Sequence, residues 1–234
     1  MKNTLLITLI ALFSLTQLSS CKKKGCTDPT ATNYNSKAKK DDGSCLYTPI
    51  LTLIGSADTS ISVGSTYNDP GATAVNKDGS SVDVVTENNV NSSTTGSYEV
   101  NYSATNANGT ATAQRVVDVV IGQDNWTVTW DVSSDCGTGF PLAGTPEVSI
   151  GTSANQLVID NMFMLVGGSA NATINGATIT IPQQSANITI GNIDFSGSGT
   201  MNSQGNQITI NYTYVNSTPL IGGEGQCVAT YTKQ

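Results

Sequence analysis

The fold is decided most clearly by the stretch NATINGATITIP at residues 171–182. Apolar side chains and threonines alternate on both sides of Asn175-Gly176, the residue pair that a two-residue type I′ hairpin turn prefers. With this turn, residues 172, 173 and 174 pair with residues 179, 178 and 177. This register puts one set of apolar side chains on a common face, namely Ala172, Ile174, Ala177, Ile179 and Ile181, and the threonines on the other. Pattern and register agree, so we expect an antiparallel hairpin with one buried face.

The same β pattern extends over residues 122–234. Short apolar runs between Gly, Asn and Ser loops predict about eight strands in an up-and-down meander, with runs at 125–132, 157–163, 188–190, 193–195, 208–214 and 228–231 beside the hairpin. A closed barrel or a two-sheet sandwich would protect the strand edges. The pattern resembles the lipocalin-like or sandwich domains that end bacterial lipoproteins, which implies an antiparallel barrel or sandwich.

Two tryptophans open this segment. Trp126 and Trp130 share one face of the predicted first strand with Val128 and Val132. Alternation with polar residues favours core packing for this face. The other interpretation is a platform for sugar binding, because sugar rings stack on exposed aromatic side chains. The candidates for such a platform are Trp126, Trp130, Phe140 and Phe163.

Residues 49–121 predict a second, smaller β unit. About seven short strands in some seventy residues are typical of a β-sandwich. The turn at Lys77-Asp78-Gly79-Ser80 predicts a tight hairpin. The segment resembles the immunoglobulin (Ig)-like domains of bacterial surface proteins, whose signature is carried here by Tyr67, Asp69, Pro70, Gly71, Gly96, Tyr98, Val100, Tyr102, Ala104 and Gly109, and more loosely by Asn106. The resemblance implies a spacer or adhesion module. The predicted fold class is therefore all-β, an Ig-like sandwich followed by an antiparallel meander.

Residues 1–20 have the layout of a signal peptide. Lys2 gives a basic start, and the apolar run at 5–15 is shorter than the about 20 residues that span a bilayer. The sequence Leu18-Ser19-Ser20-Cys21 then resembles the lipobox of bacterial lipoproteins. The resemblance implies that Cys21 becomes the mature N-terminus and carries several acyl chains, palmitate among them, which would hold the protein stably on a membrane. The alternative is an ordinary secretory leader with a chance cysteine.

Four further cysteines remain in an exported chain, so we expect two disulfides. Cys26 and Cys45 lie in one segment and Cys136 and Cys227 in another, which favours these two pairs among the three possible connectivities. Free thiols or a metal cluster are the alternatives, although no CxxC spacing occurs.

Residues 21–48 predict a short linker module next to the lipid. The stretch from Cys26 to Cys45 resembles a small module of secreted bacterial proteins with the pattern CTDPxAxNYNxxAxxDDGSC. It is too short for a core and depends on its disulfide. Side chains with oxygen donors could hold Ca²⁺, namely Asp28, Asn33, Asn35, Asp41 and Asp42, but the full EF-hand spacing is missing. Turn formation is the interpretation that we favour for these side chains.

Charge is unevenly distributed. Residues 21–48 carry a net charge of +3, residues 49–121 of −5 and residues 122–234 of −6. Lys22-Lys23-Lys24 would lie against anionic lipid headgroups, or would simply keep the linker soluble. An acidic chain does not wrap nucleic acid. The absence of histidine excludes a His-based triad and His-ligated zinc or haem.

Enzymatic signals are weak. The sequence has no GxSxG, P-loop or GxGxxG motif. Carboxylates that could in principle form a glycosidase pair are Asp131, Asp135, Asp160, Asp194 and Glu224. We predict no enzyme, no catalytic residue and no cofactor beyond the Ca²⁺ alternative.

Three functions fit this organisation. The first is a non-catalytic envelope lipoprotein, in which an Ig-like stalk (49–121) presents a C-terminal domain (122–234) for adhesion or binding. The second is a carrier of a small lipophilic ligand, because an eight-stranded barrel can enclose one. The third is a glycan-binding accessory module. The expected partners are the membrane, through Cys21, and a surface protein or glycan. We expect the outer membrane, and the sequence leaves the periplasmic or surface face open.

Overall fold

The computed structural model describes residues 22–164, 167–188 and 191–234. The predicted signal peptide and Cys21 lie outside these residues. The described chain is built from strands and two short 3₁₀ helices, η2 (Gln123–Asn125) and η3 (Gly137–Gly139), and none of its helices is long and apolar enough to cross a bilayer. Contacts divide it into two compact units. One comprises the described residues up to Thr52 with Ala72–Val85 and Ser103–Ala113, and the other Leu53–Gly71, Thr86–Tyr102 and Gln114–Gln234.

The first seven strands form two small sheets. One sheet has the order β1 (Ile50–Leu53), β3 (Ala72–Val75), β4 (Ser81–Val82). The other has the order β2 (Asp58–Ser62), β7 (Gly109–Val120), β6 (Gly96–Asn106), β5 (Val84–Asn88), with β2 parallel to β7. The predicted hairpin at residues 77–80 joins β3 to β4, where Asn76 and Ser80 pair through the backbone. The seven strands predicted for this segment are confirmed, and they form two sheets, as a β-sandwich requires.

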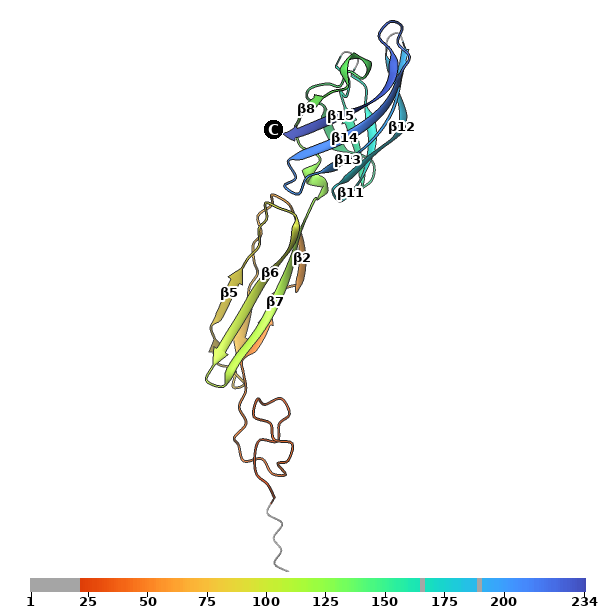
Figure 1. The fold of residues 1–234 in the computed structure, drawn as a ribbon. Helices are drawn as coiled ribbons and strands as arrows, with labels where there is room; N and C mark the ends of the chain where they lie inside the picture. Colours follow the sequence, from red (N-terminus) through yellow and green to blue (C-terminus); the bar gives the residue numbers. More distant parts are fainter. Residues whose placement is uncertain (1–21, 165–166, 189–190) are drawn as a thin grey trace, which may run out of the picture. The chain divides into compact units, whose positions relative to one another are not determined.

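The last eight strands form one antiparallel sheet, called here the C-terminal sheet. Its members are β8 (Trp130–Ser134), β9 (Glu147–Ile150), β10 (Gln156–Asp160), β11 (Ala170–Asn175), β12 (Thr178–Ile188), β13 (Gly191–Met201), β14 (Gln207–Asn216) and β15 (Gly223–Lys233). The spatial order is β8-β15-β14-β13-β12-β11-β10-β9. Figure 1 shows this sheet curling, with β12 to β15 as long neighbouring ribbons. From β9 to β15 each strand lies beside the next one in the chain, which confirms the meander for these seven strands. The first strand, β8, lies instead beside β15, so β8 and β9 are the two edges of an open, curled sheet.

Two details of this meander differ from the prediction. The strand β9 was not predicted, because only Val148 and Ile150 give Glu147–Ile150 an apolar pattern. The predicted runs at 177–182 and 188–190 belong to one strand as far as the structure describes them, since β12 passes Pro182 without ending. A register shift between Ile181 and Gln184 accommodates Pro182, as expected for a residue that cannot donate to the β ladder.

The β11–β12 hairpin confirms the predicted buried face but not the predicted register. Ile174 pairs with Ile179 and Asn175 with Thr178, so the two loop residues are Gly176 and Ala177. Gly176 has a φ of 56°, whereas Ala177 and Asn175 have no positive φ. Type I′ needs positive φ at both central residues, and type II′ needs glycine at the first. A shift of two residues preserves the face, which is why Ala172, Ile174, Ile179 and Ile181 are still buried.

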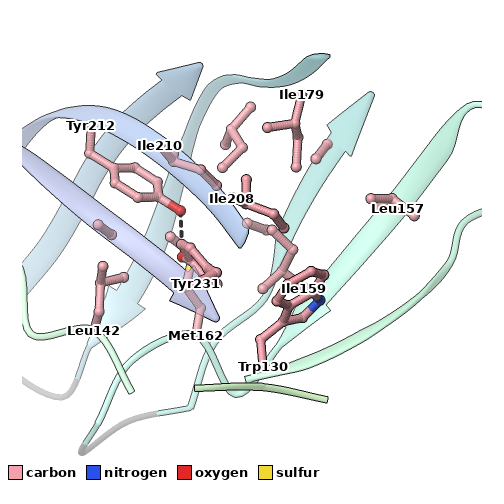
Figure 2. Packing of buried hydrophobic residues seen from close by; sticks show 14 of the residues in the cluster. Trp130, Leu142, Leu157, Ile159, Met162, Ile179, Ile208, Ile210, Tyr212 and Tyr231 are labelled. Carbon is pink, nitrogen blue, oxygen red and sulfur yellow. Dashed lines mark hydrogen bonds between the residues drawn. The ribbon is translucent and has the colours of Figure 1, made fainter. Parts of the chain in front are cut away.

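The inward face of the C-terminal sheet is filled with large side chains. Figure 2 shows Trp130 and Ile159 among these side chains, and Tyr212 joined to Tyr231 by a hydrogen bond of 2.7 Å between their hydroxyl groups. Burial raises the pKa of Tyr231 to about 12 and that of Tyr212 well above its usual range. Phe140 contacts Phe163, Phe195, Tyr212 and Tyr214 with ring centroids 5.1–5.6 Å apart.

The strand predicted at residues 125–132 is only partly present in the structure. Strand β8 begins at Trp130, while Trp126 follows η2 and ends it. Both indoles are nonetheless buried, and Nε1 of Trp130 donates to the carbonyl oxygen of Trp126 at 3.0 Å. The predicted core role of the tryptophans is therefore confirmed, although half of the strand that was to place them is a turn.

Both expected disulfides are present. Cys26 is bonded to Cys45, and Cys136 to Cys227. The second bond links the residues just after β8 to the middle of β15, its neighbour in the sheet. The first and last strands of the meander are thus held together covalently.

Candidate functional site

The signature residues of the Ig-like segment surround a buried ion pair. Arg115 on β7 is 1% exposed, and its guanidinium contacts a carboxylate oxygen of Asp69. The same carboxylate oxygen accepts hydrogen bonds from the hydroxyls of Tyr102, at 2.5 Å, and Tyr67, at 3.3 Å. The remaining donors of Arg115 reach backbone carbonyl oxygens of Ile54, Ser56 and Gly71. Sequence reasoning identified Asp69, Tyr67 and Tyr102, but it missed Arg115.

Electrostatics keep this cluster charged. Partial burial by itself raises the pKa of Asp69, but the hydrogen bonds from Tyr102 and the Gly71 amide and the charge of Arg115 outweigh it and lower the pKa below its usual value. Burial and the bond to Asp69 raise the pKa of Tyr102. Because the donors of Arg115, Tyr67 and Tyr102 are directed at protein atoms of two loops, residues 54–56 and 69–71, we assign the cluster a structural role.

The cysteine-closed module shows what its oxygen donors do. Asp28 accepts hydrogen bonds from the Tyr47 hydroxyl (2.7 Å), from the hydroxyl and the amide of Thr30 (2.7 and 2.9 Å), and from Lys77 Nζ (3.1 Å). The bonds from Tyr47 and Thr30 hold the pKa of this carboxyl well below its usual range. Lys77 also lies over the Tyr47 ring, 3.8 Å from its centroid.

The other Ca²⁺ candidates also face N–H donors. Asp41 and Asp42 accept from the amides of Gly43 and Ser44, two residues further on. Asn35 accepts from the amide of Lys37, and Asn33 bridges the Ser44 carbonyl and the Leu46 amide. These are the hydrogen bonds of turn-forming side chains. Calcium binding by Asp28, Asp41 and Asp42 stays an untested alternative to turn formation.

The four aromatic candidates for a sugar platform do not form one. Trp126, Trp130, Phe140 and Phe163 are at most 2% exposed and belong to the core. Stacking on a sugar ring needs an exposed face. The same packing gives the lipophilic carrier no support in the described residues, because side chains occupy the inward face that a ligand would need.

The outward face of the C-terminal sheet carries a recess of about 630 Å³, called here the outer recess. Its floor is one row of paired residues across four strands, in which Gly197 lies between Ile181 and Tyr212, and Tyr212 pairs with Cys227. The side chains of this row point to the core. Gly197 permits that packing, since an added Cβ would lie 2.9 Å from the Tyr212 ring.

The rows on either side of this floor are polar and point outward. Thr180, Ser198, Asn211 and Val228 pair in one row, and Ser196, Thr213 and Gln226 in the other. Pro182 and Gln183, in the register shift of β12, also line the outer recess. Small Ser196 and Ser198 thus lie between longer side chains, which makes the hollow.

One carboxylate reaches the outer recess. Asp135, after β8, accepts a hydrogen bond of 2.7 Å from the amide of Val228. Asp135, Cys136 and Cys227 form a cluster of potential metal ligands, but the two cysteines are bonded to each other and offer no thiolate. Among the other carboxylates considered for catalysis, Asp131 accepts from Gln234 and Asp194 from Ser185.

The segment that contains strands β1 to β7 matches a known protein family. Residues 51–119 match the family described as the Ig-like domain of bacterial surface proteins. The resemblance inferred from Tyr67 to Gly109 is thereby confirmed. This match fits a non-catalytic protein of the cell envelope.

No curated protein matches the chain. The crystal structure of a lipoprotein from Bacteroides thetaiotaomicron aligns with 79% of this chain and 100% of its own, at 14% identity and a TM-score of 0.31.

Proposed function

We propose that this protein is a lipid-anchored, non-catalytic envelope protein whose Ig-like segment presents the C-terminal sheet for binding. Its proposed parts are a signal peptide (1–20), a lipidated linker closed by a disulfide (21–48), the Ig-like domain (49–121) and the binding domain (122–234). The observation that carries the proposal is the match of residues 51–119 to a domain of bacterial surface proteins, directly after a cysteine-closed module.

The anchor is supported by the sequence before that module. Leu18-Ser19-Ser20-Cys21 has the small residues that a lipoprotein signal peptidase requires, and an apolar run of suitable length precedes it. Lys22-Lys23-Lys24 would add electrostatic attraction to anionic headgroups, at about 1 kcal/mol for each residue.

The binding role is supported by the way in which the segments are held. Arg115 and its partners fix the Ig-like segment from within, and Cys136–Cys227 fixes the C-terminal sheet. A rigid scaffold with an open recess on its outward face suits presentation better than chemistry, since three of the five carboxylates considered for catalysis, Asp131, Asp135 and Asp194, accept hydrogen bonds from protein groups. The resemblance of 26–45 to secreted modules agrees with export.

The test is membrane fractionation of cells that make the full chain. The wild type should stay in the membrane fraction after a high-salt wash and leave it with detergent, whereas Cys21→Ser should be soluble and fold normally. Ser20→Ala keeps a small residue before the cysteine and should behave as the wild type. Membrane retention of Cys21→Ser after the wash would refute the anchor. Protease treatment of intact cells then decides between surface and periplasmic placement.

A further inference from the structure

We propose that the outer recess binds a neutral carbohydrate, with its polar rows forming hydrogen bonds to sugar hydroxyls. This inference rests on the proposed binding role of the C-terminal sheet and names the ligand class and the residues. It places the site on the face opposite to the buried aromatic residues.

The side chains that border the outer recess have the hydrogen-bonding capacity to bind a sugar. Thr180, Ser198, Asn211, Thr213 and Gln226 are exposed side chains that border the same hollow. Hydroxyl and amide groups each offer donors and acceptors, which matches a sugar hydroxyl that also donates and accepts. The strand register spaces these groups in two parallel rows, so a chain of sugar units could lie across the strands and meet several of them.

The charge of the recess and of the surrounding domain favours a neutral ligand. The lining includes no Lys or Arg, and Asp135 is its one ionisable side chain apart from the inward-facing Tyr212. Residues 122–234 have a net charge of −6. Phosphates, sulfates and uronic acids would therefore meet a repulsive field without a cationic partner. A neutral ligand avoids this cost.

The size and shape of the outer recess also suit a sugar. A recess of about 630 Å³ lies within the range of ligand pockets, and its width comes from Ser196, Gly197 and Ser198 in the middle strand. Pro182 and Val228 lie at opposite sides and supply apolar contacts for the C–H groups of a sugar ring. Since the lining has no outward-facing aromatic ring, we expect weak binding, which suits a surface that gains avidity from many copies.

The experiment is an NMR titration of the full chain in detergent. The probes are neutral hexasaccharides of glucose, mannose, galactose and xylose, with a hexauronic acid as the charged probe. At least one neutral probe should shift the amide signals of Ser196, Ser198, Asn211, Thr213 and Gln226, and the hexauronic acid should not.

Two matched pairs of variants locate the site. Ser198→Tyr fills the hollow and should weaken binding at least tenfold, whereas Thr200→Tyr, two residues further along the same outward face, should not. Asn211→Ala should weaken binding, and Thr209→Ala on the same strand should leave it unchanged. Each variant keeps an exposed position in a regular strand, and its amide spectrum shows directly whether it folds.

The proposal fails if no neutral probe shifts these signals, if the hexauronic acid binds as well as the neutral probes, or if Ser198→Tyr and Thr200→Tyr bind equally. None of these results depends on Cys21, so the ligand class can be refuted while the anchor stands. Conversely, sugar binding by a chain that fractionates as soluble would refute the anchor alone.

Discussion

Arg115 is the centre of a buried cluster, yet it is not part of the Ig-like sequence signature. The sequence resemblance drew attention to Tyr67, Asp69 and Tyr102, and the structure explains these residues as ligands of one buried guanidinium. Arg115 lies 46 positions from Asp69, so no local motif joins the two, although Arg115 falls on the same alternating face of β7 as the buried Val117 and Val119. Its being the one cation on β7, inside an apolar run, is a signal that could have identified it.

Asp69→Asn tests the ion pair. Removing the charge leaves Arg115 buried without its counter-ion, so the free energy of unfolding should fall by about 3 kcal/mol in urea denaturation at neutral pH. Asp118→Asn removes an exposed carboxylate from the same strand as Arg115 and should change stability by less than about 0.5 kcal/mol. Equal effects of the two substitutions would contradict the assigned role.

The pH dependence of this variant follows from the sign of the pKa shift. The pKa of Asp69 in the folded protein lies below its usual value of 3.8. The stability from its charge is therefore complete above that value and is lost as pH falls toward the lowered pKa. The stability difference between wild type and Asp69→Asn should shrink from about pH 5 to about pH 2. A constant difference over this range would show that the charge is not the cause.

The β11–β12 hairpin shows which features of an element can be read from sequence. Alternation of Ala172, Ile174, Ile179 and Ile181 determines the buried face, because a face depends on residue parity alone. The turn is a different matter, since Asn175-Gly176 and Gly176-Ala177 both keep that parity. Cross-strand pairing beyond the hairpin selects the second, and Thr178 and Ile179 also pair with β13.

Substitutions in the turn distinguish the two registers. Gly176→Ala should destabilise the protein by about 1 kcal/mol, because alanine disfavours a φ of 56° although its Cβ would meet no neighbour. Asn175→Ala should have a much smaller effect, since Asn175 is a paired strand residue here. Thermal unfolding measures both. A larger loss for Asn175→Ala would favour the type I′ turn.

The disulfide between Cys136 and Cys227 is the longest-range covalent constraint on the C-terminal sheet, with a sequence separation of 91. Replacing both cysteines by alanine should lower the free energy of unfolding by about 4 kcal/mol in the loop-entropy model. Trp126 and Trp130, the two tryptophans of the chain, are both buried in this core, so their fluorescence follows its unfolding. The double alanine variant of Cys26 and Cys45 is the control and should leave that transition in place.

At the scale of the molecule, the sequence predicts the all-β class and the two β segments from local periodicity. It predicts both disulfides from the four cysteines after Cys21, which lie two to a segment. The outer recess could not be predicted from the sequence. The recess requires four strands in a definite register, including the shift at Pro182, and strand register is set by pairing across the sheet. Local alternation was a better guide for the tryptophans, since it favoured core packing for Trp126 and Trp130 and both indoles are buried.

The central proposal is that the chain is held on the envelope by Cys21. Mass spectrometry of the mature N-terminal peptide, taken from the membrane fraction of producing cells, tests this most directly. We expect a peptide that begins at Cys21 and carries a diacylglyceryl group with further acylation. A mature N-terminus at another residue, or an unmodified Cys21, would contradict the proposal.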